Sequence, residues 1–455
     1  MRLLVALKRC AGYFRFVAPV LAELEEEFEI VLVSSDADEF FGHWSKVPYT
    51  FQEPVKPMGP TTELFRQEYR GKMAYLYWAL LGVQTPQALE RAMGRKYVPE
   101  VSLRRGVSWI AHLLARTGYN RGLARRVLYA VRMVEKVIVD KAVLAHVKAI
   151  APDVVLNTPG LYPHGWEIEY IKAARRLGIP TLTLIASWDH LSGKGWLTVV
   201  PDRVLIWNQM QFREAVEYHS VKADQLAVVG SPSFDWLFDE RYMQSRTDFC
   251  RQARLDPERP FILWAASAPG NCMDEPGVVR MLMQEMRKYP ILKDYQVLIR
   301  PHPSIASKYV TDWTDWQNAD TPVWSSPTFP TGEEDKQGLF NSIAHAAAVL
   351  GLSTSVFLEA GILDRPVALL RTSVSASDAV FNKSMHFKFL LENHFPEATD
   401  SEADCARWLA EIASGNDAGR EARRWFISWF LRPQGMNLPS AKMAAEAITE
   451  LAGKR

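Results

Sequence analysis

The feature that most constrains the fold is a series of short, continuously apolar segments separated by segments with helical spacing. The apolar segments do not alternate with polar residues, which is typical of parallel strands covered on both faces. Residues 16–28 show the intervening pattern, with apolar side chains on one helical face and glutamates on the other. Strand, helix and strand in succession predict a doubly wound α/β sheet. Strands are expected at 3–7, 30–33, 153–156, 179–186, 203–207 and 226–229, with further helices at 166–177 and 211–219.

A second series of the same kind follows a turn-rich break at 230–235 and a Pro-containing segment at 256–260. Its strands are expected at 261–265, 297–299, 323–324, 348–350 and 367–370, and its helices at 278–287, 339–346 and 356–362. A chain of 455 residues is too long for one compact core. The sequence therefore predicts an α/β fold of two tandem Rossmann-like, doubly wound domains.

We expect these domains at 1–238 and 239–430, with a helical insertion at about 60–150 in the first. Residues 431–455 are predicted to form a C-terminal helix that packs back on the first domain. The stretch 91–148 is basic, with thirteen Lys or Arg against three acids. It either docks an anionic lipid-linked molecule or a membrane surface, or is a helix pair with exposed charges.

Charge and cysteine content narrow the function classes. Lys and Arg total 53 and Asp and Glu 52, so the net charge of +1 provides no global field for nucleic acid. The four cysteines lack CxxC spacing, which favours a reducing compartment over a disulfide framework or a zinc site. No apolar run reaches the roughly 18 residues of a membrane span. We therefore expect a cytoplasmic protein, with the inner face of a membrane as the alternative that the basic stretch leaves open.

The loop 187–195, SWDHLSGKG, follows a predicted strand of the first series. Ligands of open α/β sheets bind beyond the carboxyl ends of the strands, so polar side chains there are candidates for chemistry. Asp189 has the chemistry to deprotonate a hydroxyl group; His190 is the alternative base, with Asp189 then orienting it. Lys194, between two glycines, suits a phosphate. The competing interpretation is a polar loop in which Asp189 caps a turn and Lys194 is solvated.

Two loops of the second series have the chemistry of an anion site. Ser353, Thr354 and Ser355 precede a predicted helix, whose free N–H groups favour a diphosphate, and Glu359 is placed about one turn further to accept ribose hydroxyls. The alternative is an ordinary helix cap. In RPHP, Arg300 and the proline-fixed His302 either contact a phosphate or form a structural turn.

Two further features of the second series are a tryptophan at the end of a predicted strand and a run of three acidic residues. Trp324 either stacks on a nucleotide base or packs in the core. Glu333, Glu334 and Asp335 are expected in a solvated loop.

The segments LIRPHP and GLSTSVFLEAGILDRPVALL, together with the tandem domains, resemble the nucleotide-binding half of GT-B fold glycosyltransferases. The resemblance is closest to the bacterial surface-carbohydrate group that includes capsule-type transferases and glycerophosphotransferase-like enzymes. It covers roughly 261–370, and the N-terminal half matches in pattern only.

The resemblance implies that His302 and Ser353–Ser355 hold the phosphates of a nucleotide sugar and that Glu359 holds its ribose. It also implies metal-independent chemistry without a cofactor, in which Arg300, His302 and Lys194 neutralise the leaving diphosphate. The base then comes from the first domain, which makes Asp189 the candidate. Gly12, Tyr13, His164 and Trp188 are candidates for the acceptor side, although His164 also fits a surface histidine.

The expected function is transfer of a sugar from a nucleotide sugar to a glycan or lipid-linked acceptor in surface polysaccharide synthesis. Two enzymatic alternatives keep the fold: phosphotransfer from a CDP-linked polyol, and epimerisation of a nucleotide sugar. A scaffold that only binds a glycan or a protein is the non-enzymatic alternative.

Overall fold

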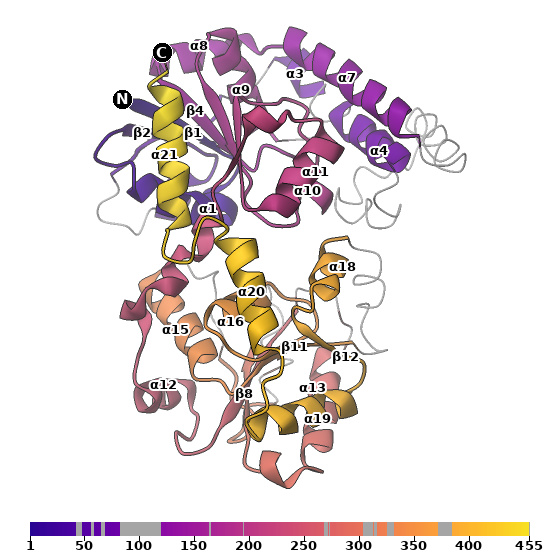
Figure 1. The fold of residues 1–455 in the computed structure, drawn as a ribbon. Helices are drawn as coiled ribbons and strands as arrows, with labels where there is room; N and C mark the ends of the chain where they lie inside the picture. The colour runs from indigo at the N-terminus through magenta and orange to yellow at the C-terminus, as the bar shows by residue number, and fades with distance from the viewer. Residues whose placement is uncertain are drawn as a thin grey trace. The chain divides into compact units, whose positions relative to one another are not determined.

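The computed structural model describes residues 1–41, 48–55, 59–64, 69–81, 120–162, 165–193, 195–267, 272, 274–303, 313, 316–324, 332–371 and 385–454. They form two compact units, each with its own parallel sheet (Figure 1). Unit 1 consists of Met1–Asp235 and Phe430–Arg455, and unit 2 of Trp236–Trp429. The α/β fold class predicted from the apolar segments is confirmed.

The sheet of unit 1 has seven strands in the order β3-β2-β1-β4-β5-β6-β7, and every pair is parallel. Chain order reverses beside β1, where β2 lies on one side and β4 on the other. Such a switch point is where ligands bind in doubly wound sheets. The strands are β1 (Arg2–Leu7), β2 (Glu29–Val33), β3 (Thr50–Gln52), β4 (Val154–Thr158), β5 (Thr181–Leu184), β6 (Arg203–Ile206) and β7 (Leu226–Val228).

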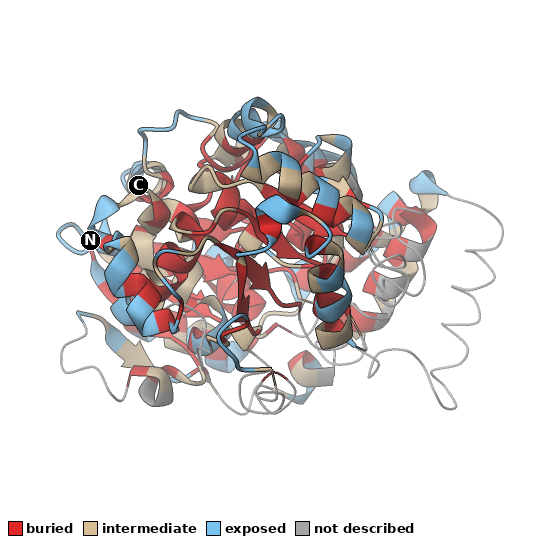
Figure 2. Ribbon diagram, turned by 90° about the horizontal axis from the view of Figure 1, so that it is seen from below, coloured by how far each residue is buried: buried red, intermediate tan, exposed pale blue. Residues whose placement is uncertain are grey.

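Alternate residues of β1 enter two different cores. Leu3, Val5 and Leu7 pack with α1 and the C-terminal helix α21, whereas Leu4 and Ala6 pack with α8 and α9. Both faces of the sheet are therefore covered, which explains why its strands read as continuous apolar runs. These helices are α1 (Cys10–Ala22), α8 (Lys141–Ile150), α9 (Glu167–Arg176) and α21 (Ser440–Ala452). Figure 2 shows strands in the buried colour, with exposed residues on the surrounding helices and loops.

The remaining helices of unit 1 include α4 and α7, from the predicted insertion, which pack against each other. A buried ion cluster of Arg70, Glu135, Glu169 and Lys172 joins α4 and α7 to α9, and the four side chains are at most 3% exposed. Arg70 contacts both carboxylates, and the Lys172 ammonium lies 2.9 Å from each. These helices are α2 (Ala37–Phe41), α3 (Pro60–Leu64), α4 (Arg70–Leu81), α7 (Arg121–Val137), α10 (His190–Gly193) and α11 (Gln209–His219).

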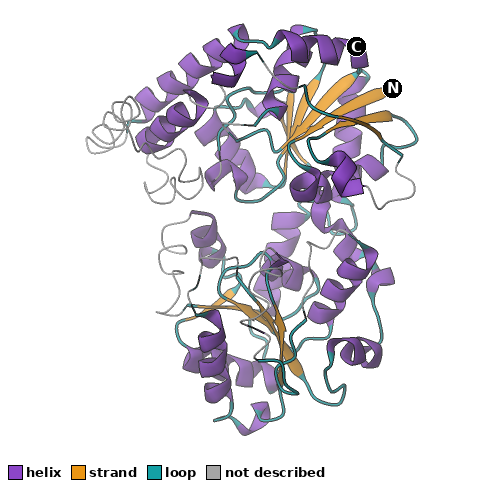
Figure 3. Cartoon of the chain, turned by 180° about the vertical axis from the view of Figure 1, so that it is seen from behind, coloured by secondary structure: helices purple, strands orange, loops and turns teal. Residues whose placement is uncertain are grey.

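Unit 2 has a five-stranded parallel sheet in the order β12-β11-β10-β8-β9, seen with its helices in Figure 3. Its strands are β8 (Phe261–Ala265), β9 (Gln296–Arg300), β10 (Val349–Gly351), β11 (Val367–Leu370) and β12 (Glu397–Thr399). Its helices are α12 (Arg246–Ala253), α13 (Glu275–Met286), α15 (Glu333–Ala344), α16 (Val356–Ile362), α18 (Met385–Glu392) and α19 (Glu402–Ala413), together with most of α20 (Arg420–Leu431), whose last two residues belong to unit 1.

Two local predictions for unit 2 are wrong. The strand expected at 323–324 is a single bridge between Val323 and Ile299. Glu333, Glu334 and Asp335, expected in a loop, form the first turn of α15, where the helix dipole favours acidic side chains.

Candidate functional site

In unit 1, the loops after β1 and β4 and the segment after β5 bring aromatic and charged side chains together. The Lys8 ammonium lies 4.0 Å from the centre of the Tyr162 ring, and the Tyr162 ring meets those of Tyr13 and His190 edge to face. Burial raises the pKa of Tyr13, as do Tyr162, Glu167 and Asp189 nearby. The structure thus places the predicted residues Tyr13, Asp189 and His190 in one polar cluster at the carboxyl edge of the sheet.

Asp189 and His190 are buried side chains on a segment that is well fixed. The Ser187 hydroxyl donates to an Asp189 carboxylate oxygen at 2.6 Å, and the His190 backbone N–H donates to the Ser187 carbonyl at 3.2 Å. The Gln211 side-chain amide of α11 donates to the same carbonyl at 3.1 Å. This segment therefore holds Asp189 in one orientation, as a base needs, although the Ser187 bond is also the local turn that the alternative interpretation predicts.

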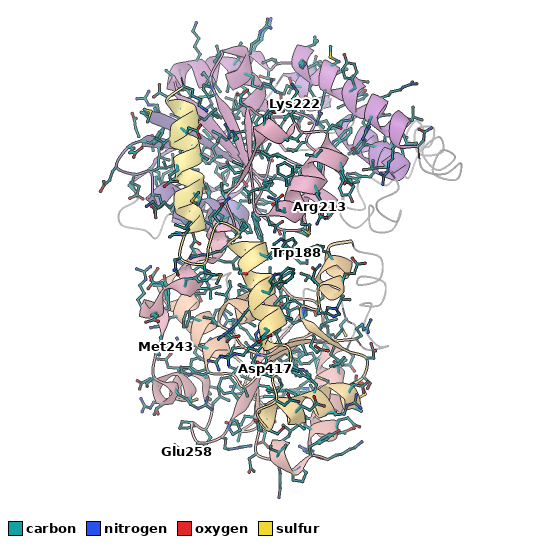
Figure 4. The ribbon with its side chains drawn as sticks, in the orientation of Figure 1. Trp188, Arg213, Lys222, Met243, Glu258 and Asp417 are labelled. Carbon is teal, nitrogen blue, oxygen red and sulfur yellow. The ribbon has the colours of Figure 1, made fainter. Side chains whose placement is uncertain are left out.

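Four other predicted residues of unit 1 lie apart from this arrangement or outside the described residues. Trp188 packs edge to face against Phe430 at 6.2 Å and is labelled in Figure 4. Gly12 is exposed on α1, and a side chain there would meet no atom within 4 Å. His164 and Lys194 lie outside the described residues.

Glu167 is a site candidate that sequence reasoning missed. It is the first residue of α9, is fully buried, and has a pKa raised to about 7 by desolvation, against the opposing effect of Lys8. A Cβ atom at Gly165 would clash with the Glu167 carboxylate, so the glycine permits their close approach. The sequence signal was an acid at the start of a helix that follows a strand; the pattern alone reads as a helix-dipole acid.

Glu214 of α11 is a second buried acid that no sequence pattern predicted as a site residue. Burial raises its pKa to about 8, the Asp189 charge acts in the same direction, and a bond from Ser192 acts against it. Asp189 therefore has a buried carboxyl nearby that is neutral at pH 7 and suited to sharing or relaying a proton.

In unit 2, Arg300 ends β9 and is 7% exposed. Burial lowers the pKa of its guanidinium to about 10, while Glu359 and Asp335 act in the opposite direction. Its Nη1 atom is buried and has no hydrogen-bond partner among the described residues. A buried donor of this kind costs free energy unless a ligand accepts its hydrogen bond, so the environment of Arg300 is suited to an anion.

The loop between β10 and α16 lies at the same edge of this sheet. A Cβ atom at Gly351 would lie 2.6 Å from the Ala265 carbonyl oxygen, so glycine allows β10 and the end of β8 to approach. Ser353 is buried, Thr354 Oγ1 accepts from the Val356 N–H at 3.3 Å, and Ser355 is exposed without a capping side-chain bond. Thr354 therefore forms part of the cap that the alternative interpretation predicts, and the Ser355 hydroxyl makes no such bond.

The other predicted residues of unit 2 differ in their surroundings. Glu359 is buried in α16 near Arg300, and His302 is half-buried two residues beyond β9. The Trp324 ring stacks on Phe249 at 5.1 Å and lies against Gly338 of α15. Packing within unit 2, the alternative stated for Trp324, thus accounts for the contacts of its ring.

The chain contains an Asp-x-Asp spacing, Asp36 and Asp38, which can bind a metal ion in other proteins. The expectation of metal-independent chemistry does not take this pair into account. The Asp36 carboxylate caps α1 by accepting from the backbone N–H groups of Cys10 and Ala11, at 2.6 and 3.2 Å. Among the residues that the structure describes, no three His, Cys, Asp or Glu side chains group closely enough to hold a metal ion.

Within the same residues, no helix has the length and apolar content to cross a membrane. The four cysteines form no disulfide.

No protein-family model and no curated protein matches the chain. Among solved structures, the UDP-GlcNAc 2-epimerase from Methanocaldococcus jannaschii superposes with a TM-score of 0.54 and 12% identity, over 99% of this chain and 100% of that chain. The UDP-GlcNAc 2-epimerase from Neisseria meningitidis bound to UDP-GlcNAc gives the same values. A variant of the wall teichoic acid polymerase TagF superposes with a TM-score of 0.51 and 9% identity, over 100% of this chain and 89% of that chain.

At these identities the likeness shows the fold alone. The narrower resemblance to the capsule-type and glycerophosphotransferase-like group stays a prediction. The chain has a two-domain α/β fold of the GT-B type.

Proposed function

We propose that the protein is a glycosyltransferase that binds a nucleotide sugar through unit 2 and transfers the sugar to a glycan or lipid-linked acceptor. The observation that carries the proposal is Arg300, a buried cation whose Nη1 atom lacks a partner among the described residues. It ends β9 at the carboxyl edge of a parallel sheet, where ligands of this architecture bind. The diphosphate of a nucleotide sugar supplies the acceptor atoms that this nitrogen lacks.

In this proposal, different side chains of unit 2 bind different parts of the nucleotide sugar. Arg300 and His302 stabilise the charge that develops on the leaving diphosphate, and Ser353–Ser355 add hydroxyl and backbone donors. Glu359 accepts from the ribose hydroxyls. Its buried carboxylate also balances the Arg300 charge, so Arg300 is not an isolated buried cation.

Unit 1 supplies the base in this proposal. Asp189 removes the proton from the acceptor hydroxyl as that oxygen attacks the anomeric carbon, and the diphosphate departs with the bonding electron pair. Burial raises the pKa of Glu214 to about 8, so this neighbour is already protonated near pH 7, and the proton from the acceptor stays on Asp189 until solvent takes it. Epimerases and the polymerase TagF share this fold, which is compatible with the proposal without selecting it.

Nucleotide titration followed by the thermal midpoint tests the donor assignment. We expect one of UDP, GDP, CDP and CMP to stabilise the folded protein, by about 2.7 kcal/mol at a concentration of about 100 Kd. The variant Arg300→Met should lose this stabilisation, whereas Arg287→Met, at an exposed arginine at the end of α13, should keep it. If no nucleotide stabilises the wild type, or if Arg300→Met responds like the wild type, the donor assignment is wrong.

A second candidate function, epimerisation of a nucleotide sugar, is favoured by one observation. Unit 1 holds two buried carboxyls, Glu167 and Glu214, whose pKa values of about 7 and 8 suit proton transfer to and from a sugar carbon. Incubation with the donor alone separates the candidates: an isomerised nucleotide sugar supports epimerisation, and product formation only when an acceptor is added supports transfer. Preference for cytidine nucleotides, with transfer of a polyol phosphate, identifies the phosphotransferase alternative.

A further inference from the structure

A cavity of about 210 Å³ lies in unit 1 beyond the carboxyl ends of β2 and β3, and no described residue of the loops after β4 and β5 lines it. Most of its lining residues are polar. The lining residues are Ser34, Ser35, Asp36, Ala37, Phe51, Gln52 and Glu53. The volume is below the roughly 300 Å³ at which pockets for drug-sized ligands begin, so the cavity suits one ring of a larger ligand.

The two carboxylates of the cavity, Asp36 and Glu53, differ in how many hydrogen-bond donors of the protein they already contact. Asp36 accepts hydrogen bonds from the Cys10 and Ala11 N–H groups and from the Ser34 hydroxyl, and its carboxylate lies 3.6 Å from the Arg9 guanidinium. These donors occupy its lone pairs and offset its charge. Glu53 makes no hydrogen bond or ion pair with any described residue, so its carboxylate is available and gives the cavity a net negative charge.

Gln52 offers the complementary donor, and a hydrogen-bond chain fixes its orientation. The Val55 N–H donates to the Tyr170 hydroxyl at 3.3 Å, and that hydroxyl lies 2.9 Å from His146 Nδ1. His146 Nε2 in turn lies 2.6 Å from Gln52 Oε1. Burial lowers the pKa of His146, so the ring is neutral, with Nε2–H donating to Gln52. The Gln52 carbonyl is thus occupied, and no described residue accepts from its amide nitrogen.

We propose that this cavity binds one uncharged sugar ring and rejects a phosphorylated one. The sugar hydroxyls donate to the Glu53 carboxylate and accept from the Gln52 amide. A phosphate would be placed beside the uncompensated Glu53 charge. That the bound ring belongs to the acceptor rests on the proposed glycosyltransferase function; the binding and its charge selectivity do not.

Saturation-transfer NMR at millimolar ligand tests the binding without any nucleotide. The probes are the methyl glycosides of glucose, galactose, mannose and N-acetylglucosamine, with glucose 1-phosphate as the charged counterpart. We expect at least one methyl glycoside to bind, and glucose 1-phosphate to bind about tenfold more weakly than a neutral ring. The inference is overturned if none of the four glycosides binds or if the phosphate binds equally well.

Variants assign the binding to this cavity. Ser35→Phe fills the cavity and should abolish the saturation-transfer signal of the sugar. Glu53→Gln should weaken binding of the neutral ring about fivefold and reduce the difference in affinity between the neutral ring and glucose 1-phosphate. Glu26→Gln, at an exposed glutamate outside the lining, should change neither. Unchanged binding in Ser35→Phe, or unchanged selectivity in Glu53→Gln, contradicts the inference.

The thermal midpoint of each variant reports whether it is folded, and Glu53→Gln alters only an exposed side chain. A nucleotide-dependent shift of the midpoint that persists in Ser35→Phe shows that the donor site is intact. In the wild type, failure of sugar binding together with a nucleotide-dependent shift refutes the cavity proposal alone, and sugar binding without any nucleotide effect refutes the proposed function alone.

Discussion

Replacing Glu167 with glutamine should stabilise the protein in a strongly pH-dependent way. The fold raises the pKa of this fully buried carboxyl from 4.5 to about 7, chiefly by desolvation. A raised pKa means that the folded state disfavours the charged form. The associated stability is present below the unfolded-state value and is lost as the pH rises through about 7.

At about 1.4 kcal/mol per unit, the shift corresponds to about 3 kcal/mol of lost stability well above pH 7. Glutamine has the same shape and carries no charge, so Glu167→Gln removes this loss. The pKa of about 7 already includes the favourable effect of Lys8 on the carboxylate, so we expect a net stabilisation of about 3 kcal/mol. If Glu167 also takes part in the reaction, the same variant becomes more stable and less active.

Urea unfolding of wild type and variant at about pH 5 and about pH 9 measures the effect. We expect nearly equal free energies of unfolding at the lower pH and a clear difference at the higher one. The control is Glu446→Gln, at an exposed glutamate on α21, which should change little at either pH. A difference that stays constant between the two pH values, or a variant that is less stable at high pH, would refute the assignment of a buried, destabilised carboxylate.

Three further predictions follow from contacts in the two units. Glu214→Gln should raise the free energy of unfolding increasingly as the pH rises from 4.5 to about 8, because burial raises the pKa of Glu214 over that interval; urea titrations across this pH range measure the effect. Asp189→Asn should lower the rate of sugar transfer roughly 10²–10⁴-fold while the nucleotide still shifts the thermal midpoint, and retained activity would remove Asp189 as the base. Gly351→Ala should cost about 1–3 kcal/mol of stability, because the new methyl group would lie 2.6 Å from the Ala265 carbonyl oxygen. Gly419→Ala, where nothing lies within 4 Å, is its matched control in thermal unfolding.

The fold was largely predictable because buried parallel strands leave a strong local signal. β1, β4 and β8 are buried along nearly their whole length, so each reads as a continuous apolar run. β3 and β12 were missed because each has three residues, lies at the edge of its sheet and is only partly buried. The wrongly predicted strand at 323–324 is apolar for another reason: Trp324 packs on Phe249.

Residues of the candidate site could be predicted only where they lie at the end of a strand that the sequence pattern reveals. Arg300 is the last residue of β9 and Asp189 follows β5, and strand ends can be found by pattern. The roles suggested for Glu167 and Glu214 depend on desolvation by residues distant in sequence, and helix periodicity contains no such information. The cavity near Glu53 was also missed, since it depends on β3.

The buried cluster of Arg70, Glu135, Glu169 and Lys172 has a consequence for how this protein can diverge. Its two cations and two anions come from three helices, and loss of any one leaves an uncompensated charge in the interior at a cost of about 3–5 kcal/mol. Single substitutions at these positions should therefore be rejected, whereas paired ones can be neutral. The helical insertion is in this sense not an interchangeable module: grafted onto another scaffold of this fold, it requires a recipient α9 that carries the matching glutamate and lysine.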